Sequence, residues 1–124
     1  MADPRSSLAL AGERLAEKLL RQKGMRTLGR RYSTPVGELD LVMRDADTIV
    51  FVEVKTQRDA RWQAPQERVT RAKQARLIRA AKWFLIRKRL TAATCRFDVF
   101  AVILPESGAA EHAHFENAFT PRSW

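Results

Sequence analysis

Two apolar segments separated by a short polar turn constrain the fold of this chain more than any other feature. Residues 38–44 (ELDLVMR) and residues 48–55 (TIVFVEVK) are rich in β-branched and other large apolar residues, and the sequence DAD lies between them. Such runs are typical of β-strands, and a turn of this length joins two antiparallel strands. The sequence therefore predicts a β-hairpin near the middle of the chain.

Charged side chains gather on one face of this hairpin, because side chains alternate between the two faces of a strand. The other face is predicted to be apolar and to carry Leu39, Leu41, Met43, Val50, Val52 and Val54. The charged face has Asp40 in the first strand, and Glu53 and Lys55 in the second. Matching the two apolar faces places Asp40 directly opposite Glu53, at a Cβ separation of about 4.5–5.5 Å.

Two carboxylates at this separation repel each other unless a positive charge lies between them. Their oxygens suit a hard divalent cation such as Mg²⁺, which keeps several waters and can activate one of them. Lys55, on the same face as Glu53, could then orient that water or stabilise charge that develops on a phosphate. A surface ion pair between Glu53 and Lys55 is the alternative, and the residues alone leave both interpretations open.

The remaining elements are predicted from periodicity and turn residues. Two helices are expected at residues 7–23 and 66–90, and further strands at residues 25–32, 95–104 and 112–119. A single domain is expected over residues 7–120, between flexible tails at residues 1–6 and 121–124. The resulting order, α-β-β-β-α-β-β, is that of an α/β domain with a mixed sheet.

Composition narrows the class of partner and the compartment. Lysine and arginine total 23 against 14 acidic residues, a net charge of +9, which favours a nucleic-acid partner, although a basic solvated surface is the simpler explanation. No apolar run approaches the roughly 20 residues that span a bilayer, so no membrane association is expected. Cys95 is the only cysteine, which excludes an internal disulfide and fits the reducing cytoplasm.

The motifs GELD and FVEVK resemble the D…(D/E)-x-K signature of the restriction-endonuclease-like nuclease superfamily. They belong to a series of five segments in order along the chain: GERLAEKLL, GELDLVMRD, FVEVKTQ, VTRAKQARLIRAAKWFL and RFDVFAV. By this series the sequence is identified as a member of the YraN-like family of small predicted endonucleases, relatives of the archaeal Holliday junction resolvases. The resemblance covers about residues 12–119 and implies a restriction-endonuclease-like mixed central sheet flanked by helices.

The resemblance also implies an active site. Mg²⁺ or Mn²⁺ would be held by Asp40, Glu53 and the backbone carbonyl of Val54, with Lys55 beside the metal. In the related resolvases a glutamate of the first helix completes the site, and Glu13 occupies that position here. The implied activity is hydrolysis of phosphodiester bonds, structure-selective on branched or single-stranded nucleic acid, with DNA favoured over RNA and a homodimer left open. The alternative is a nucleic-acid-binding module that keeps the fold and does not cleave.

Four further residues are expected to contact nucleic acid: Lys73, Gln74, Arg31 and Arg58. Lys73 projects into the apolar arc of the second helix and Gln74 lies near its edge, although snorkelling of the Lys73 ammonium into water is the alternative. Arg31 stands where family members often carry an asparagine, so this segment departs from the family pattern. Arg58 precedes Trp62, for which stacking on a base and capping the core are both open.

Other charged positions are expected to be structural or solvated. Glu13 lies at the edge of the apolar stripe of the first helix, where it could reach the sheet or remain solvated, and Glu17 is expected on the surface. Asp98 interrupts the most apolar strand, which predicts burial and hydrogen bonding, with Arg96 assigned to the opposite face. A basic face of the second helix is expected to be solvated rather than DNA-binding, with Arg68, Arg71, Arg79 and Lys82.

Overall fold

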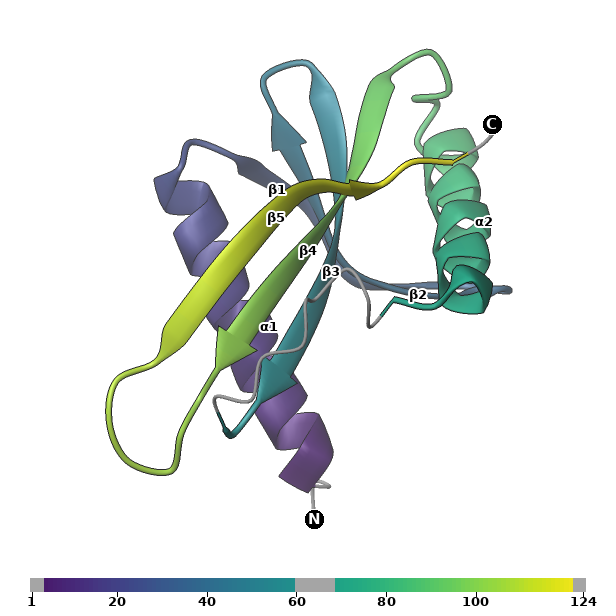
Figure 1. Ribbon diagram of the computed structural model, residues 1–124. Helices are drawn as coiled ribbons and strands as arrows, with labels where there is room; N and C mark the ends of the chain where they lie inside the picture. The colour runs from purple at the N-terminus through teal and green to yellow at the C-terminus, as the bar shows by residue number, and fades with distance from the viewer. Residues whose placement is uncertain (1–3, 60–68, 122–124) are drawn as a thin grey trace.

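The computed structural model describes residues 4–59 and 69–121, in the arrangement shown in Figure 1. The helices are α1 (Pro4–Gln22) and α2 (Arg71–Arg87). The strands are β1 (Arg26–Thr34), β2 (Gly37–Asp45), β3 (Thr48–Gln57), β4 (Thr94–Ile103) and β5 (Glu111–Phe119). The predicted order α-β-β-β-α-β-β is confirmed. Within the described residues, no helix is long and apolar enough to cross a membrane.

The strands form one mixed sheet in the order β1-β2-β3-β4-β5. β3 and β4 run parallel, and the other neighbouring pairs are antiparallel. A parallel pair needs a crossover connection, and the segment that contains α2 supplies it. The two helices lie on opposite sides of the sheet (Figure 1), so the expected mixed sheet flanked by helices is also confirmed.

Each helix covers its own apolar core. The core under α2 includes Val42, Phe51, Leu77, Phe84, Phe97 and Val99. The core under α1 includes Ala16, Leu20, Leu41, Met43, Val50 and Phe100. Because β4 contributes side chains to both cores, its sequence is apolar almost throughout rather than alternating.

The central hairpin has the predicted register. Leu41 pairs with Val52, and the ladder continues to Asp45 and Thr48 at the turn. The pairing ends at Leu41 and Val52, one position before Asp40 and Glu53 would face each other. The carboxylate of Asp40 therefore takes the place of a backbone carbonyl, and its Oδ2 accepts a hydrogen bond of 2.9 Å from the N–H of Val54.

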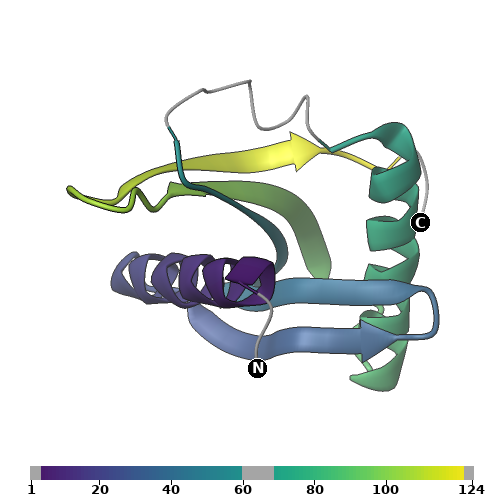
Figure 2. The same cartoon turned by 90° about the horizontal axis from the view of Figure 1, so that it is seen from below.

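Beyond this point β2 pairs with β1 alone, and the tip of the β1–β2 hairpin runs out toward α2 (Figure 2). Leu39 packs there in the core under α2, whereas Leu41 and Met43 pack under α1. The prediction that Leu39 shares a face with Leu41 and Met43 is therefore wrong. Strict alternation applies to a regular strand, and β2 changes direction where it leaves β3.

Three boundaries also differ from the prediction. α1 begins at Pro4, so residues 4–6 belong to the helix and not to a tail, which fits the tolerance of proline in a first helical turn. α2 begins at Arg71, where the Thr70 side chain caps it by accepting a hydrogen bond of 3.1 Å from the Lys73 N–H. It ends at Arg87 and not at residue 90. Residues 1–3 and 122–124 of the predicted tails lie outside the described residues.

Candidate active site

Asp40 and Glu53 come together where the β2–β3 ladder ends. Glu53 is buried and only 7% exposed, whereas Asp40 is half-buried and bonded to the Val54 N–H. Burial and the charge of Glu53 raise the pKa of Asp40 to about 8. A carboxyl group whose pKa is raised by a neighbouring carboxylate marks a position where added positive charge is favoured.

Two lysines lie against the Glu53 side of this pair. The Nζ of Lys73, from the first turn of α2, lies 2.6 Å from Glu53 Oε1, and the Nζ of Lys55 lies 3.4 Å from the same oxygen. Burial and a hydrogen bond with Lys73 lower the pKa of Lys55. Burial opposes the charged form of Lys73 as well, yet its bonds to Glu53 and Lys55 leave the pKa of Lys73 raised. Lys73 is thus the charged partner of Glu53, and Lys55 gives up its proton more readily than a free lysine.

α1 approaches the same region through a glycine. A Cβ atom at Gly12 would overlap the side chain of Thr56 on β3, so only glycine allows the helix to pass this close to the strand. The next residue, Glu13, is 9% exposed, and its charge contributes to raising the pKa of Asp40, after burial and Glu53. The sequence-based expectation that Glu13 can reach the sheet is therefore met.

Glu13 is already paired with Arg31 of β1. Arg31 Nε lies 2.8 Å from Glu13 Oε1, and Arg31 Nη2 donates to Oε2 at 3.4 Å. Arg31 has a φ of 43°, an uncommon conformation for a residue other than glycine. Arg31, which was expected to contact nucleic acid, thus binds the carboxylate of Glu13, which was expected to complete the site.

Two carboxylates, those of Asp40 and Glu53, would be available to a divalent cation at this position. Within the described part of the chain, no three histidine, cysteine, aspartate or glutamate side chains are grouped closely enough to hold a metal ion. Asp40 and Glu53 offer two carboxylates in a partly buried position, which suits Mg²⁺ or Mn²⁺ with waters filling the other positions. Val54, whose backbone carbonyl was expected to bind the metal, contacts Asp40 through its N–H. A cation here would replace the proton of Asp40 and loosen the contact of Lys73 with Glu53.

Two of the expected nucleic-acid contacts lie apart from this group. The Gln74 side-chain amide donates to the Val69 carbonyl at 2.9 Å, just before α2 begins. Arg58 Nη1 donates to the Leu104 carbonyl at 3.4 Å, at the ends of β3 and β4. Both side chains are thus bonded to the backbone in this structure. Trp62, which was expected to stack on a base or cap the core, lies outside the described residues.

Glu17, which was expected on the surface, is buried and bonded to β1. It is 9% exposed, and it accepts hydrogen bonds from Arg30 Nε at 2.7 Å and Thr27 Oγ1 at 2.6 Å. The hydrogen bond from Arg30 is the largest cause of its lowered pKa. A signal for this contact exists in the sequence, since Glu13 and Glu17 are one helical turn apart and adjacent arginines follow on β1.

Asp98 is buried and hydrogen-bonded as expected, but its partners include Arg96, which was expected on the opposite face. It is 0% exposed, and it accepts hydrogen bonds from Arg96 Nε at 3.0 Å and the Asn117 N–H at 2.9 Å, with His114 Nε2 at 2.7 Å. The assignment of Arg96 to the opposite face is wrong, because residues two apart in a strand share a face. Burial alone would raise the pKa of Asp98, but the bonds from His114 and Arg96 lower it.

Comparison with known proteins gives a consistent match along the chain. The family model described as "Uncharacterised protein family UPF0102" matches residues 12–102. A protein of Syntrophotalea carbinolica named "UPF0102 protein" is 45% identical over 124 residues, the full length of both chains. A "UPF0102 protein" of Pelotomaculum thermopropionicum is 42% identical over 120 residues, covering 96% of this chain and all of the relative. Another, from Chromohalobacter salexigens, is 47% identical over 104 residues, which is 84% of this chain and 80% of the relative.

Proposed function

The chain belongs to the uncharacterised protein family UPF0102, and for this member we propose the activity of a metal-dependent nuclease that hydrolyses phosphodiester bonds. The observation that carries the proposal is the interacting pair Asp40 and Glu53 with Lys55 two residues further along β3. A raised pKa at Asp40, with a value of about 8, is the electrostatic signature of a site suited to a cation. The proposal includes kinship of the fold with restriction-endonuclease-like nucleases.

Asp40 and Glu53 are the residues that would hold Mg²⁺ or Mn²⁺. When bound, such a cation acts as a Lewis acid at the phosphate and makes a bound water more acidic. The role of Asp40 is to lose its proton and to present its carboxylate in an orientation fixed by the Val54 N–H. Glu53 presents its carboxylate from the buried end of the same pair.

The two lysines serve different steps. Lys55, with its lowered pKa, is suited to accept a proton from the attacking water or to donate one to developing charge on the phosphate. Lys73 forms an ion pair with Glu53 in the free protein. When substrate binds, its ammonium group would move from Glu53 to a phosphate. Glu13 is a positioning residue in this scheme, since its carboxylate is already bound by Arg31.

The net charge of +9 supports a nucleic-acid substrate. We propose DNA over RNA and branched or single-stranded forms over plain duplex. The protein would act in the cytoplasm, where the free thiol of Cys95 is kept reduced.

A nucleic-acid-binding module without cleavage is the second candidate. The specific observation in its favour is that cations of the protein itself already neutralise two of the acids, through Lys73 at Glu53 and Arg31 at Glu13. In that case the same basic residues would bind phosphates and the carboxylates would only position them.

A substrate panel tests the proposal against this alternative. DNA and RNA as single strands, duplexes, flaps and four-way junctions are incubated with Mg²⁺ or Mn²⁺, beside an Asp40→Asn variant purified identically. The proposal predicts metal-dependent cleavage by the wild type and none by the variant. Binding without cleavage in the wild type, or equal cleavage by both proteins, would reject the nuclease and in the first case favour the binding module.

A further inference from the structure

The charge of α2 is entirely of one sign. Over Arg71–Arg87 the helix has no acidic residue, and its basic residues are Arg71, Lys73, Arg76, Arg79, Lys82 and Arg87. Lys73 pairs with Glu53 at the candidate active site, and none of the other five forms an ion pair with any residue in the described ranges 4–59 and 69–121. A helix with this much unbalanced positive charge is suited to a polyanion and unsuited to a second copy of itself.

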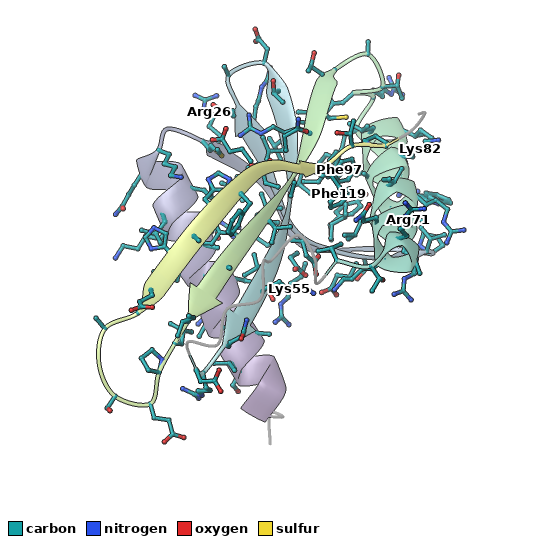
Figure 3. All side chains as sticks on the ribbon, viewed as in Figure 1. Arg26, Lys55, Arg71, Lys82, Phe97 and Phe119 are labelled. Atoms are coloured by element: carbon teal, nitrogen blue, oxygen red, sulfur yellow. The ribbon has the colours of Figure 1, made fainter. Side chains whose placement is uncertain are left out.

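Part of this charge forms a stripe that begins at the candidate site. Lys73, Arg76, Trp83 and Arg87 are spaced so that a helix of 3.6 residues per turn brings them onto one flank. At a rise of about 1.5 Å per residue, Trp83 lies about 15 Å along the axis from Lys73, and Arg87 about 21 Å. In Figure 3, Lys55 lies on the sheet toward the Arg71 end of α2, and Lys82 marks the other end.

The first part of the stripe borders a cavity. Lys73 and Arg76 line a space of about 270 Å³ together with Val36, Gly37 and Glu38 of the β1–β2 hairpin. The cavity therefore links the lysine that touches Glu53 to the next cation of the stripe. A chain leaving the site between the hairpin and α2 would pass Arg76 first.

Trp83 is the other unusual member of the stripe. It is 41% exposed, one helical turn from both Arg79 and Arg87, and the neighbouring Ile86 is 63% exposed. An exposed aromatic ring between cations is the arrangement by which proteins bind single-stranded nucleic acid, with bases stacked on the ring and phosphates held by the charges. A duplex offers its phosphates to such a surface, but its bases are already stacked on one another.

We infer that α2 guides an unpaired strand of nucleic acid away from the candidate active site, with phosphates on Arg76 and Arg87 and one base stacked on Trp83. The inference rests on the proposed function, because that function places a phosphate near Lys73. It adds that the substrate has unpaired nucleotides beside the bond that is cleaved. It concerns binding, so it can be tested without cleavage.

The test is fluorescence anisotropy with labelled oligothymidylate and with a duplex of equal length, in the presence of EDTA. Trp83→Ala should weaken single-strand binding by roughly five- to a hundredfold, the range for loss of one base–aromatic stack. Trp83→Phe should restore most of the affinity because it keeps a ring. Lys82→Ala is the matched control, since its side chain lies on another flank, and its affinity should be close to that of the wild type.

The arginines have a separate readout in the same assay. Arg76→Ala and Arg87→Ala should each reduce the slope of log affinity against log salt by about 0.7, the contribution of one phosphate contact on a single strand. An unchanged slope in both variants would overturn the assignment of phosphates to these residues.

Three other outcomes would overturn the inference. The first is equal single-strand affinity for wild type and Trp83→Ala, and the second is an equal loss on duplex and single strand. The third is a change in sedimentation without a change in affinity, which would make the stripe a contact between copies of the chain. Cleavage by the wild type is scored separately. Trp83-dependent binding without cleavage therefore removes the nuclease alone, and cleavage with Trp83-independent binding removes this inference alone.

Discussion

Asp40 and Asp98 lie on strands of the same sheet, but their surroundings act on them in opposite directions. Asp98 is fully buried and receives hydrogen bonds from Arg96 and the Asn117 N–H, with His114 against its other oxygen. Asp40 receives one backbone N–H and faces a second carboxylate. The pKa of Asp98 is consequently lowered, and that of Asp40 is raised to about 8.

Under the proposed function, the difference separates a structural acid from a metal-binding one. A buried carboxylate with several donors stabilises the fold, because removing it would leave those donors unpaired. A carboxyl group that faces a second carboxylate and has one backbone donor of its own, as Asp40 has, gains from an external cation. The site at the end of the β2–β3 ladder is of the second kind, and this contrast is the main physical argument for a metal there.

A large effect on cleavage is expected at Lys55, on the functional side of the comparison. Lys55→Ala should slow cleavage by about a hundred- to a thousandfold, the range for loss of one group that stabilises transition-state charge. Nucleic-acid affinity should change little, because one charge of many is lost. Single-turnover cleavage and anisotropy measure the two quantities, and cleavage at the wild-type rate would end the catalytic role of Lys55.

The structural side is tested by Asp98→Ala. This change leaves Arg96 and His114 without their buried partner, and the free energy of unfolding should fall by about 3–5 kcal/mol. Urea denaturation of the metal-free protein gives this value. A loss below about 1 kcal/mol, no more than one neutral hydrogen bond contributes, would mean that Asp98 does not stabilise the fold through several hydrogen bonds.

The two aspartates should also give opposite pH dependences of stability. Native Asp40 keeps its proton up to a pH of about 8, whereas an unfolded aspartate loses it near pH 4. The native state then binds more protons between these values, so the Asp40 contribution to the free energy of unfolding falls as the pH rises. The lowered pKa of Asp98 works in the opposite direction, and its contribution is lost as the pH falls below about 4.

Asp40→Asn isolates this effect. In EDTA, its unfolding free energy should decline less between pH 5 and 8 than that of the wild type, because the titrating group is gone. Urea denaturation at several pH values provides the comparison. Parallel curves for the two proteins would contradict the raised pKa of Asp40.

The smallest effect is expected at Arg31. Arg31→Ala removes a cation that binds Glu13 beside Asp40, and divalent-metal affinity should rise by roughly fivefold, as for loss of a partly exposed charge. Arg30→Ala is the matched control, because Arg30 binds Glu17 in the same manner but away from the pair. Isothermal calorimetry measures both, and an equal change in the two variants would show that Arg31 has no specific effect.

The hairpin at the centre of the site was predictable because strand alternation has a short, strict period. The ladder from Leu41 and Val52 to Asp45 and Thr48 follows the predicted register. Leu39 was not predictable in the same way, because the bend that moves it under α2 arises where β2 separates from β3. The start of α2 had a local signal in Thr70, a good N-cap residue, that hydrophobic periodicity alone does not detect.

Contacts between elements account for the other differences. Glu17 was judged from the periodicity of α1, but its burial depends on Arg30 and Thr27 of β1. Arg31 was expected at the substrate, and its pairing with Glu13 joins β1 to α1, a contact between two elements. Helix and strand periods describe which face a residue occupies, and they do not describe which side chain from another element meets it.

Calorimetric titration with Mn²⁺ at pH 8 tests the central claim most directly, that Asp40 and Glu53 together hold a divalent cation. The wild type should bind one ion, and the affinity should fall strongly in both Asp40→Asn and Glu53→Gln, because each removes one of the two carboxylates. Glu17→Gln serves as the control for loss of a buried acid elsewhere and should bind as the wild type does. Equal affinity in the wild type, Asp40→Asn and Glu53→Gln would contradict the account.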